Sequence, residues 1–258
     1  MKIVGISGGS GAGKSTVSRG LAKILPNAVF IDVDPFFREA TDKLEGEIFK
    51  AIKMVKEEGV LNQNYFFSSL EAMNAWINVI KDYVSCRIEE TVAKLGEEND
   101  YIIVDWCYLP MCSYFEKCDY TLCVKADYHT RFKRLSDRMK AVNGYSIASG
   151  PSFYEYQKEP FENRVKYSAI DEYGYSSQFE IVNDRDIESL NKSVKMIAEG
   201  IVSLDSRKKI ISTRINNGMM PKFNSTLIQN PIIQSRGSGH IITPSQRNVA
   251  GQYVEYNR

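Results

Sequence analysis

Residues 8–15 read Gly-Gly-Ser-Gly-Ala-Gly-Lys-Ser and match the pattern GxxxxGK[ST] at every fixed position. Glycines let such a loop turn tightly, so that successive backbone N–H groups point inward at phosphate oxygens. The apolar run 2–7 precedes the pattern, and residues 15–25 after it carry apolar side chains at helical spacing. A loop between a buried strand and a helix also receives the positive end of the helix dipole. The sequence therefore predicts a loop that binds the phosphates of a nucleoside triphosphate.

The side chains of this loop have separate predicted roles. Lys14 supplies a mobile cation to the β- and γ-phosphates, and the Ser15 hydroxyl ligates Mg²⁺. We expect ATP as the nucleotide and Mg²⁺ as the metal ion. The predicted nucleotide-binding residues are Gly8, Gly9, Ser10, Gly11, Ala12, Gly13, Lys14, Ser15 and Thr16.

Predicted strands and helices alternate along the chain. Apolar runs predict strands at 2–7, 28–34, 101–105, 120–126 and 179–184. Apolar side chains at helical spacing predict helices at 15–25, 45–58, 68–95, 128–141 and 186–203. This alternation indicates an α/β fold with a parallel sheet and helices on both faces. Open sheets of this kind bind ligands at the carboxyl ends of their strands.

Three acidic residues stand at predicted strand ends. Asp32 and Asp34 lie two apart, so on a strand they share one face. A carboxylate beside the phosphate loop accepts the proton of an attacking hydroxyl. We predict Asp34 as this base and Asp32 as a helper through a water or the metal; the choice between them stays open, as does a helix-capping role. Asp105 is the second predicted metal residue, acting through a water, or an acid that merely caps a strand end.

The predicted helix 128–141 carries Arg131, Arg134 and Arg138 along one stripe. We predict that Arg134 and Arg138 clamp the charge of the transferred phosphoryl group, since guanidinium groups form paired hydrogen bonds with phosphate oxygens. The alternative is a solvated basic face. Residues 139–158 are predicted to form a lid that excludes water.

Four aromatic residues have two interpretations, as the lining of an acceptor pocket or as core. They are Tyr65, Phe66, Phe67 and Trp76.

Composition changes near Leu204 and suggests two units. Residues 205–258 contain eight Lys and Arg against two acids, whereas residues 1–204 contain 25 against 30. We predict a catalytic domain at 1–204, with acceptor-side helices at about 45–95, and a basic extension at 205–258. The extension is either loosely packed or an arm that docks on a neighbouring subunit or an acidic partner.

Overall charge and hydropathy suggest a small-molecule partner and a cytoplasmic location. The net charge of +1 favours neither nucleic acid nor membrane as a partner. No apolar run is long enough to span a bilayer, and the first residues enter a strand directly.

The motifs together resemble the dephospho-coenzyme A kinase family over about the first 200 residues. GISGGSGAGKSTVSRGLAKIL followed by FIDVDPFFREA is similar to its phosphate loop and second strand. EEGVLNQNYFF, WINVIKDYVSCRIEE, TRFKRLSDR and FEIVND are similar to later family motifs in the same order. The resemblance implies a P-loop kinase fold and ATP-dependent phosphorylation of a ribose hydroxyl, expected to be the 3′-hydroxyl of dephospho-coenzyme A. It also places the enzyme in coenzyme A biosynthesis.

The sequence departs from the family pattern on the acceptor side. Gln63 stands where the family has Arg, Lys81 and Asp82 stand where it has His-Pro, and Tyr154 replaces an Arg. Uridine kinases are also similar, since their second strand ends in Asp-Ser-Phe-Tyr and this one in Asp-Pro-Phe-Phe at 34–37. The alternatives are therefore a nucleoside kinase that acts on a 5′-hydroxyl, or a nucleotide-binding protein without metabolite kinase activity.

Overall fold

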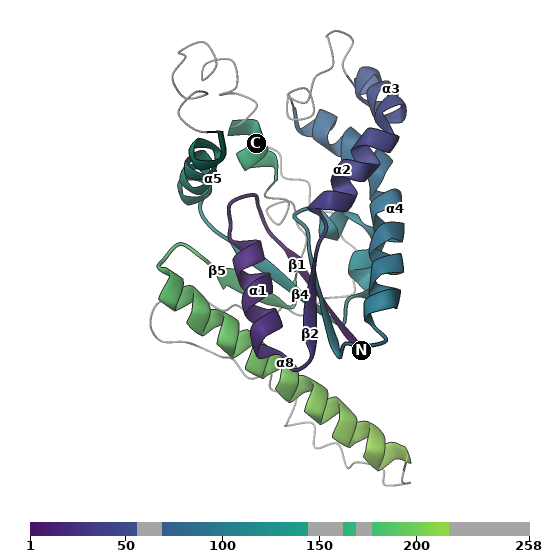
Figure 1. Cartoon of the computed structure of the whole chain (residues 1–258), viewed down its shortest axis with the longest axis vertical. Coiled ribbons are helices and arrows are strands. Elements are labelled where there is room, and N and C mark those ends of the chain that lie inside the picture. Colours follow the sequence, from purple (N-terminus) through teal and green to yellow (C-terminus); the bar gives the residue numbers. More distant parts are fainter. Residues whose placement is uncertain (56–68, 144–161, 169–176, 217–258) are drawn as a thin grey trace, which may run out of the picture.

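The computed structural model describes residues 1–55, 69–143, 162–168 and 177–216. This part of the chain contains a sheet of five parallel strands in the order β2-β3-β1-β4-β5 (Figure 1). The strands are β1 Lys2–Ser7, β2 Ala28–Asp32, β3 Tyr101–Asp105, β4 Tyr120–Lys125 and β5 Phe179–Val182. The predicted α/β fold is confirmed.

Helices cover both faces of the sheet (Figure 1). Helices α1, Lys14–Ile24, and α8, Ile187–Asn216, pack on one face and form a core with the strands. The opposite face is covered by α2, Asp34–Lys43, α3, Glu45–Val55, and α4, Leu70–Leu95. Successive residues of a strand point to opposite faces. All five residues of β3 are therefore buried, some in each core.

The topology of the sheet determines where along its strands a ligand site forms. Strand β1 is central, and the chain pairs β3 on one side of it and β4 on the other. Connections that leave a strand in opposite directions open a crevice at its carboxyl end, where such folds bind ligands. After β3 the chain forms two 3₁₀ turns, Leu109–Met111 and Ser113–Lys117. Helix α5, Tyr128–Asn143, follows β4 near this edge (Figure 1).

The second strand is shorter than predicted, and this changes the position of Asp34. Strand β2 ends at Asp32, and Asp34 is the first residue of α2, a helix that the sequence analysis missed. The prediction that both acids share a strand face is therefore wrong. Pro35 favours a helix start, and Asp34 suits the first turn because of the helix dipole. The Asp34 N–H also donates to Asp32 Oδ1 at 3.1 Å.

The last helix continues beyond the composition change at Leu204. Helix α8 reaches Asn216, and Asp205 accepts hydrogen bonds of 2.6 Å from the hydroxyls of both Tyr101 and Tyr120. The start of the predicted basic extension is thus bonded to the sheet, and residues 217–258 lie outside the described part. No helix among the described residues combines the length and apolar character needed to cross a membrane.

Candidate active site

The loop between β1 and α1 has the backbone geometry of an anion site. Gly13, directly before α1, has a φ of 100°, in the left-handed region that glycine adopts without strain. A Cβ atom on Gly13 would lie 2.3 Å from Asn183 Nδ2. Among the described residues, no side chain caps α1, and the N–H groups of Lys14 and Ser15 remain for a ligand. These amides and the Lys14 side chain suit an anion at the carboxyl end of β1.

The outside of the loop is braced by the end of β5 and by α5. Asn183, which is buried, donates from Nδ2 to the Ala12 carbonyl at 2.7 Å and from its backbone N–H to the Lys125 carbonyl at 2.7 Å. Arg134 donates to the carbonyls of Asn183 at 3.0 Å and Gly11 at 3.4 Å. Since these contacts take up loop carbonyls, the loop keeps its shape without a ligand.

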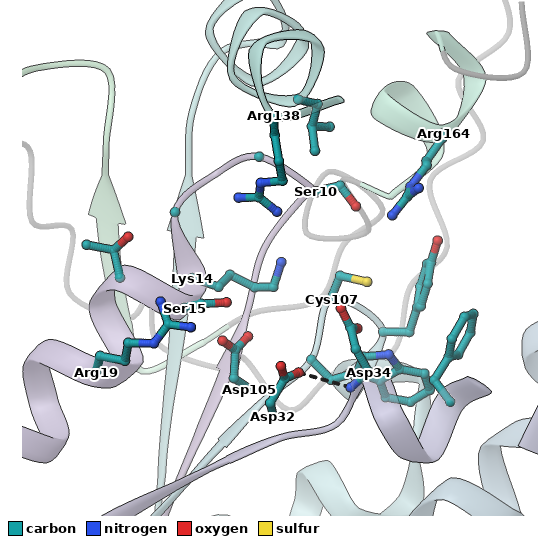
Figure 2. A pocket seen from close by; sticks show the side chains of 17 residues that line it. Ser10, Lys14, Ser15, Arg19, Asp32, Asp34, Asp105, Cys107, Arg138 and Arg164 are labelled. Carbon is teal, nitrogen blue, oxygen red and sulfur yellow. Dashed lines mark hydrogen bonds between the residues drawn. The ribbon is translucent and has the colours of Figure 1, made fainter. Parts of the chain in front are cut away.

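A pocket opens beside the loop and gathers most of the predicted site side chains (Figure 2). Its lining residues come from the loop and α1, the ends of β2 and β3, α2, α5 and the segment 162–168. They are Ser10, Gly11, Gly13, Lys14, Ser15, Thr16, Arg19, Asp32, Asp34, Phe37, Asp105, Trp106, Cys107, Tyr108, Leu135, Arg138 and Arg164. The loop residues Gly8, Gly9 and Ala12 lie behind this surface, and so does Arg134.

The carboxylate of Asp105, predicted to act on the metal ion, is deeply buried. Asp105 is 4% exposed and accepts a hydrogen bond from Ser18 Oγ at 3.1 Å. Burial raises the pKa of the Asp105 carboxyl, whereas Lys14, Ser15 and Ser18 lower it. Asp105 is in register with Asp32 on the neighbouring strand. A buried carboxylate with a raised pKa gains from a cation placed beside it.

Asp32 and Asp34 occupy different parts of the pocket. In Figure 2, Asp32 lies next to Asp105, while Asp34 lies nearer Cys107. Both side chains are exposed to the pocket. The hydrogen bond from the Asp34 N–H uses one Asp32 oxygen and leaves the Asp34 carboxylate directed elsewhere. The two carboxylates therefore occupy different positions in the pocket.

The arginines of α5 do not act as one stripe. Arg131 is 2% exposed and donates to the backbone carbonyls of Ala126 and Val165. Arg134 braces the loop, as above, and only Arg138 of the three lines the pocket. Figure 2 shows Arg138 and Arg164 across the pocket from the three aspartates, with Lys14 between the two groups.

Comparison with known protein families identifies the chain. The sequence model of dephospho-CoA kinase matches residues 2–148, more than half of the chain. The chain belongs to the dephospho-CoA kinase family. It is therefore an ATP-dependent phosphotransferase that acts on an alcohol group, as the motifs predicted.

Solved structures with low sequence identity are also similar to the kinase. A Thermus thermophilus protein, TT1252, is 22% identical over 68% of this chain and 98% of its own, with a TM-score of 0.39. Shikimate kinases from Bacteroides thetaiotaomicron and Acinetobacter baumannii, the latter solved with shikimate, are 15% and 14% identical. They cover 78% and 81% of this chain and 98% and 95% of their own, with TM-scores of 0.38 and 0.36. A comparison with curated proteins gives no match.

One of the four predicted aromatic residues of the kinase can be placed. Trp76 is a core residue, 4% exposed, and the predicted residues 65–67 lie outside the described part. Among the described residues, the pocket is lined by the aromatic side chains Phe37, Trp106 and Tyr108, with the Phe37 ring centroid 5.8 Å from Trp106 and 6.2 Å from Tyr108. Phe37 is the most exposed of these rings, and it lies one helical turn after Asp34 on α2.

Cysteine chemistry is not indicated in the described part of the kinase. Burial raises the pKa of the pocket residue Cys107 to about 12, so its thiol stays protonated at neutral pH. All five cysteines are free. The described residues hold no cluster of three or more His, Cys, Asp or Glu side chains that would bind a metal. A Mg²⁺ ion of a nucleotide kinase needs fewer protein ligands, because phosphates and waters supply the others.

Two cationic residues of the pocket were missed by the sequence analysis. Arg19 lies one turn after Ser15 on α1, and its guanidinium carbon lies 5.7 Å from the Phe30 ring centroid. Helical spacing from Ser15 was an available signal for Arg19. The sequence carried no such signal for Arg164, because this residue lies outside every predicted helix and strand. Beyond Asn143 the predicted lid lies outside the described residues.

Proposed function

We propose that this kinase transfers the γ-phosphoryl group of ATP to the 3′-hydroxyl of dephospho-coenzyme A. The family match supports this acceptor. The observation that carries the proposal is the arrangement of the pocket. An exposed carboxylate, Asp34, faces Arg164 and Arg138 across the pocket, with Lys14 between them (Figure 2). This arrangement offers a base to a hydroxyl and cations to the group it attacks.

The nucleotide half of the site is formed by the loop. The amides of Gly11, Gly13, Lys14 and Ser15 and the Lys14 ammonium group bind the β- and γ-phosphates. Ser15 and Asp105 fit a Mg²⁺ ion, because both present oxygen atoms and the buried Asp105 carboxyl has a raised pKa that a cation would lower. When bound, Mg²⁺ neutralises charge on the transferred phosphoryl group.

The acceptor half lies at the start of α2. Asp34 accepts the proton of the acceptor hydroxyl while the hydroxyl oxygen attacks the γ-phosphorus. The bond between the γ-phosphorus and the bridging oxygen breaks, and ADP leaves with that oxygen. Asp32 holds the backbone N–H of Asp34 and lies on the metal side of the pocket. Arg138 and Arg164 stabilise the charge of the transferred group, and Arg134 braces the loop instead.

A nucleoside kinase is the second candidate, favoured by one local observation. The segment Asp34-Pro35-Phe36-Phe37 is similar to the uridine kinase pattern, and both Asp34 and Phe37 line the pocket. In that case Phe37 would contact the nucleoside base and Asp34 the 5′-hydroxyl. A third candidate, a nucleotide-binding protein without an acceptor, predicts ATP binding alone.

Acceptor-dependent ADP release separates these candidates. We expect release of ADP with dephospho-coenzyme A, and a much lower rate with uridine or with no acceptor. Higher turnover with uridine would favour the nucleoside kinase, and ATP binding without acceptor-dependent release the third candidate. A thermal-shift series with a non-hydrolysable ATP analogue gives an independent measure, because a ligand of the native state raises the melting temperature.

Two wider expectations remain predictions. We expect a homo-oligomer formed through the basic extension 205–258, and the structure, which describes this extension only to Asn216, does not test it. Its test is the mass of the protein in solution with and without that segment. The cytoplasmic location also stays a prediction.

A further inference from the structure

The segment 162–168 carries Arg164 into the pocket and is held by buried polar groups. Its last residue, Ser168, is 0% exposed, and Arg131 of α5, which contacts the segment, is 2% exposed. Buried polar groups cost free energy unless they are hydrogen-bonded. The partners of Ser168 and Arg131 therefore decide how firmly Arg164 is placed.

Ser168 connects this segment to the phosphate loop. The Ser10 N–H donates to Ser168 Oγ at 2.9 Å, across 158 positions of the sequence. The Ser168 hydroxyl in turn donates to the Val165 carbonyl at 3.4 Å, and Arg131 Nη1 donates to the same carbonyl. Arg131 Nε donates to the Ala126 carbonyl at 3.1 Å. A continuous chain of hydrogen bonds thus runs from the phosphate loop, through the Arg164 segment, to the end of β4.

The loop also packs directly on Arg131. A Cβ atom on Gly9 would lie 2.5 Å from Arg131 Nη1, closer than real Cβ contacts allow. The loop, Arg131 and the segment are therefore in contact with no spare volume at this point. In such a packed arrangement a small change at one group displaces the others.

We propose that Ser168 is a positioning residue of the kinase. Its hydroxyl fixes the Arg164 segment against the phosphate loop, so that the Arg164 guanidinium faces the γ-phosphoryl group. The Ser10 N–H is satisfied by Ser168 and does not serve the nucleotide. This role rests on one part of the proposed function, namely that the pocket binds ATP with its γ-phosphate facing Arg164. The role does not depend on the identity of the acceptor.

The test is the preference of the protein for ATP over ADP, which needs no acceptor. The two dissociation constants are measured by competition with a fluorescent ADP analogue, without acceptor, for the full chain. Ser168→Ala removes the acceptor of the part-buried Ser10 N–H and the bond that joins the Arg164 segment to the loop, and we expect it to lower the ATP preference about tenfold. Arg164→Met should lower it similarly, and the double variant no further than either single variant. The matched control is Ser193→Ala, because Ser193 Oγ bonds a carbonyl within α8, away from the pocket.

Several outcomes would overturn the proposal. These are an unchanged ATP preference in Ser168→Ala or in Arg164→Met, effects that multiply in the double variant, or an equal loss in Ser193→Ala. Ser168→Cys keeps the volume and a weak acceptor, so we expect an intermediate loss. It serves as the test if Ser168→Ala does not fold. A parent that prefers ATP but phosphorylates no dephospho-coenzyme A would contradict the proposed acceptor and leave this inference standing.

Discussion

Lys14 is the residue on which we expect nucleotide recognition to depend most. It lies between the aspartates and the arginines of the pocket, and its ammonium group donates to the Gly9 carbonyl at 3.4 Å. We expect Lys14→Ala to lower kcat/KM about 100-fold or more, since it removes a cation aimed at the transferred charge. The measurement is acceptor-dependent ADP release. Lys23→Ala, an exposed lysine in the last turn of the same helix, should retain parent activity.

Asp34 and Asp32 are distinguished by the kind of defect each substitution causes. Asp34→Asn should lower kcat about 100-fold or more, with nearly unchanged ATP affinity, because the removed base acts only during transfer. Asp32→Asn should lower kcat less and raise the Mg²⁺ concentration needed for half-maximal activity, since Asp32 lies beside Asp105. The measurement is kcat against Mg²⁺ concentration. The reverse pattern would make Asp32 the base.

At the scale of single residues, the sequence predicts those site residues that lie next to one another in the chain. The loop glycines, Lys14 and Ser15 are adjacent in the chain, so one motif places them. Arg164 and Ser168 are placed near the loop by tertiary contacts, such as the bond between Ser10 and Ser168. No spacing in the sequence predicts these contacts. Helical spacing put Arg131, Arg134 and Arg138 on a common stripe, but it does not say which of them turn toward the loop, as Arg134 does.

Helix α2 sets the direction of Asp34, and one of its carboxylates, Glu39, bonds to α4. Glu39 accepts hydrogen bonds from Lys43 Nζ at 2.8 Å, the Tyr83 hydroxyl at 2.7 Å and Arg87 Nε at 3.3 Å. The bonds from Lys43 and Tyr83 lower the pKa of the Glu39 carboxyl from 4.5 to about 2. Tyr83 and Arg87 belong to α4, so Glu39 joins the two helices.

A lowered carboxyl pKa makes the contribution of Glu39 depend on pH. The stabilisation is fully present above the ordinary value of 4.5 and is lost as the pH falls toward about 2, where the folded carboxylate takes up a proton. We therefore expect Glu39→Gln to lower the melting temperature at neutral pH, and the gap to the parent to narrow below pH 4.5. Glu47→Gln, an exposed acid on α3, is the control and should change little. A gap that stays constant over this range would contradict the assignment.

At the scale of elements, periodicity predicted the long helices and buried strands well. It failed at α2, a helix of ten residues that follows β2 almost directly, because the run 28–34 looked like one strand. The start of α2 depends on Pro35 and on the bond between Asp34 and Asp32, which are turn chemistry and not hydrophobic pattern.

At the scale of the whole molecule, the last helix, α8, is bonded to the sheet at the amino ends of β3 and β4. This end of the sheet is opposite the active site. Asp205 of α8 accepts hydrogen bonds from the hydroxyls of Tyr101 and Tyr120. These two residues begin β3 and β4 and are 7% and 2% exposed. Burial raises the pKa of both tyrosines, and the nearby Asp205 raises it further, so both hydroxyls remain donors. The composition change at Leu204 gave no sign of this contact, because a charge count does not say which acid turns toward the core.

This anchor predicts a loss of stability without a loss of catalysis. Asp205→Ala removes the carboxylate that accepts from both part-buried hydroxyls, at a cost of about 1–3 kcal/mol in the free energy of unfolding. Urea denaturation measures that cost. Activity at room temperature should remain, because the site lies at the carboxyl ends of the strands and Tyr101 and Tyr120 are the first residues of β3 and β4. Glu199→Ala on the same helix removes an exposed acid 3.9 Å from Lys195 and should cost well under 1 kcal/mol. Equal losses in the two variants would show that any acid on α8 contributes as much, and that the two tyrosines do not anchor it.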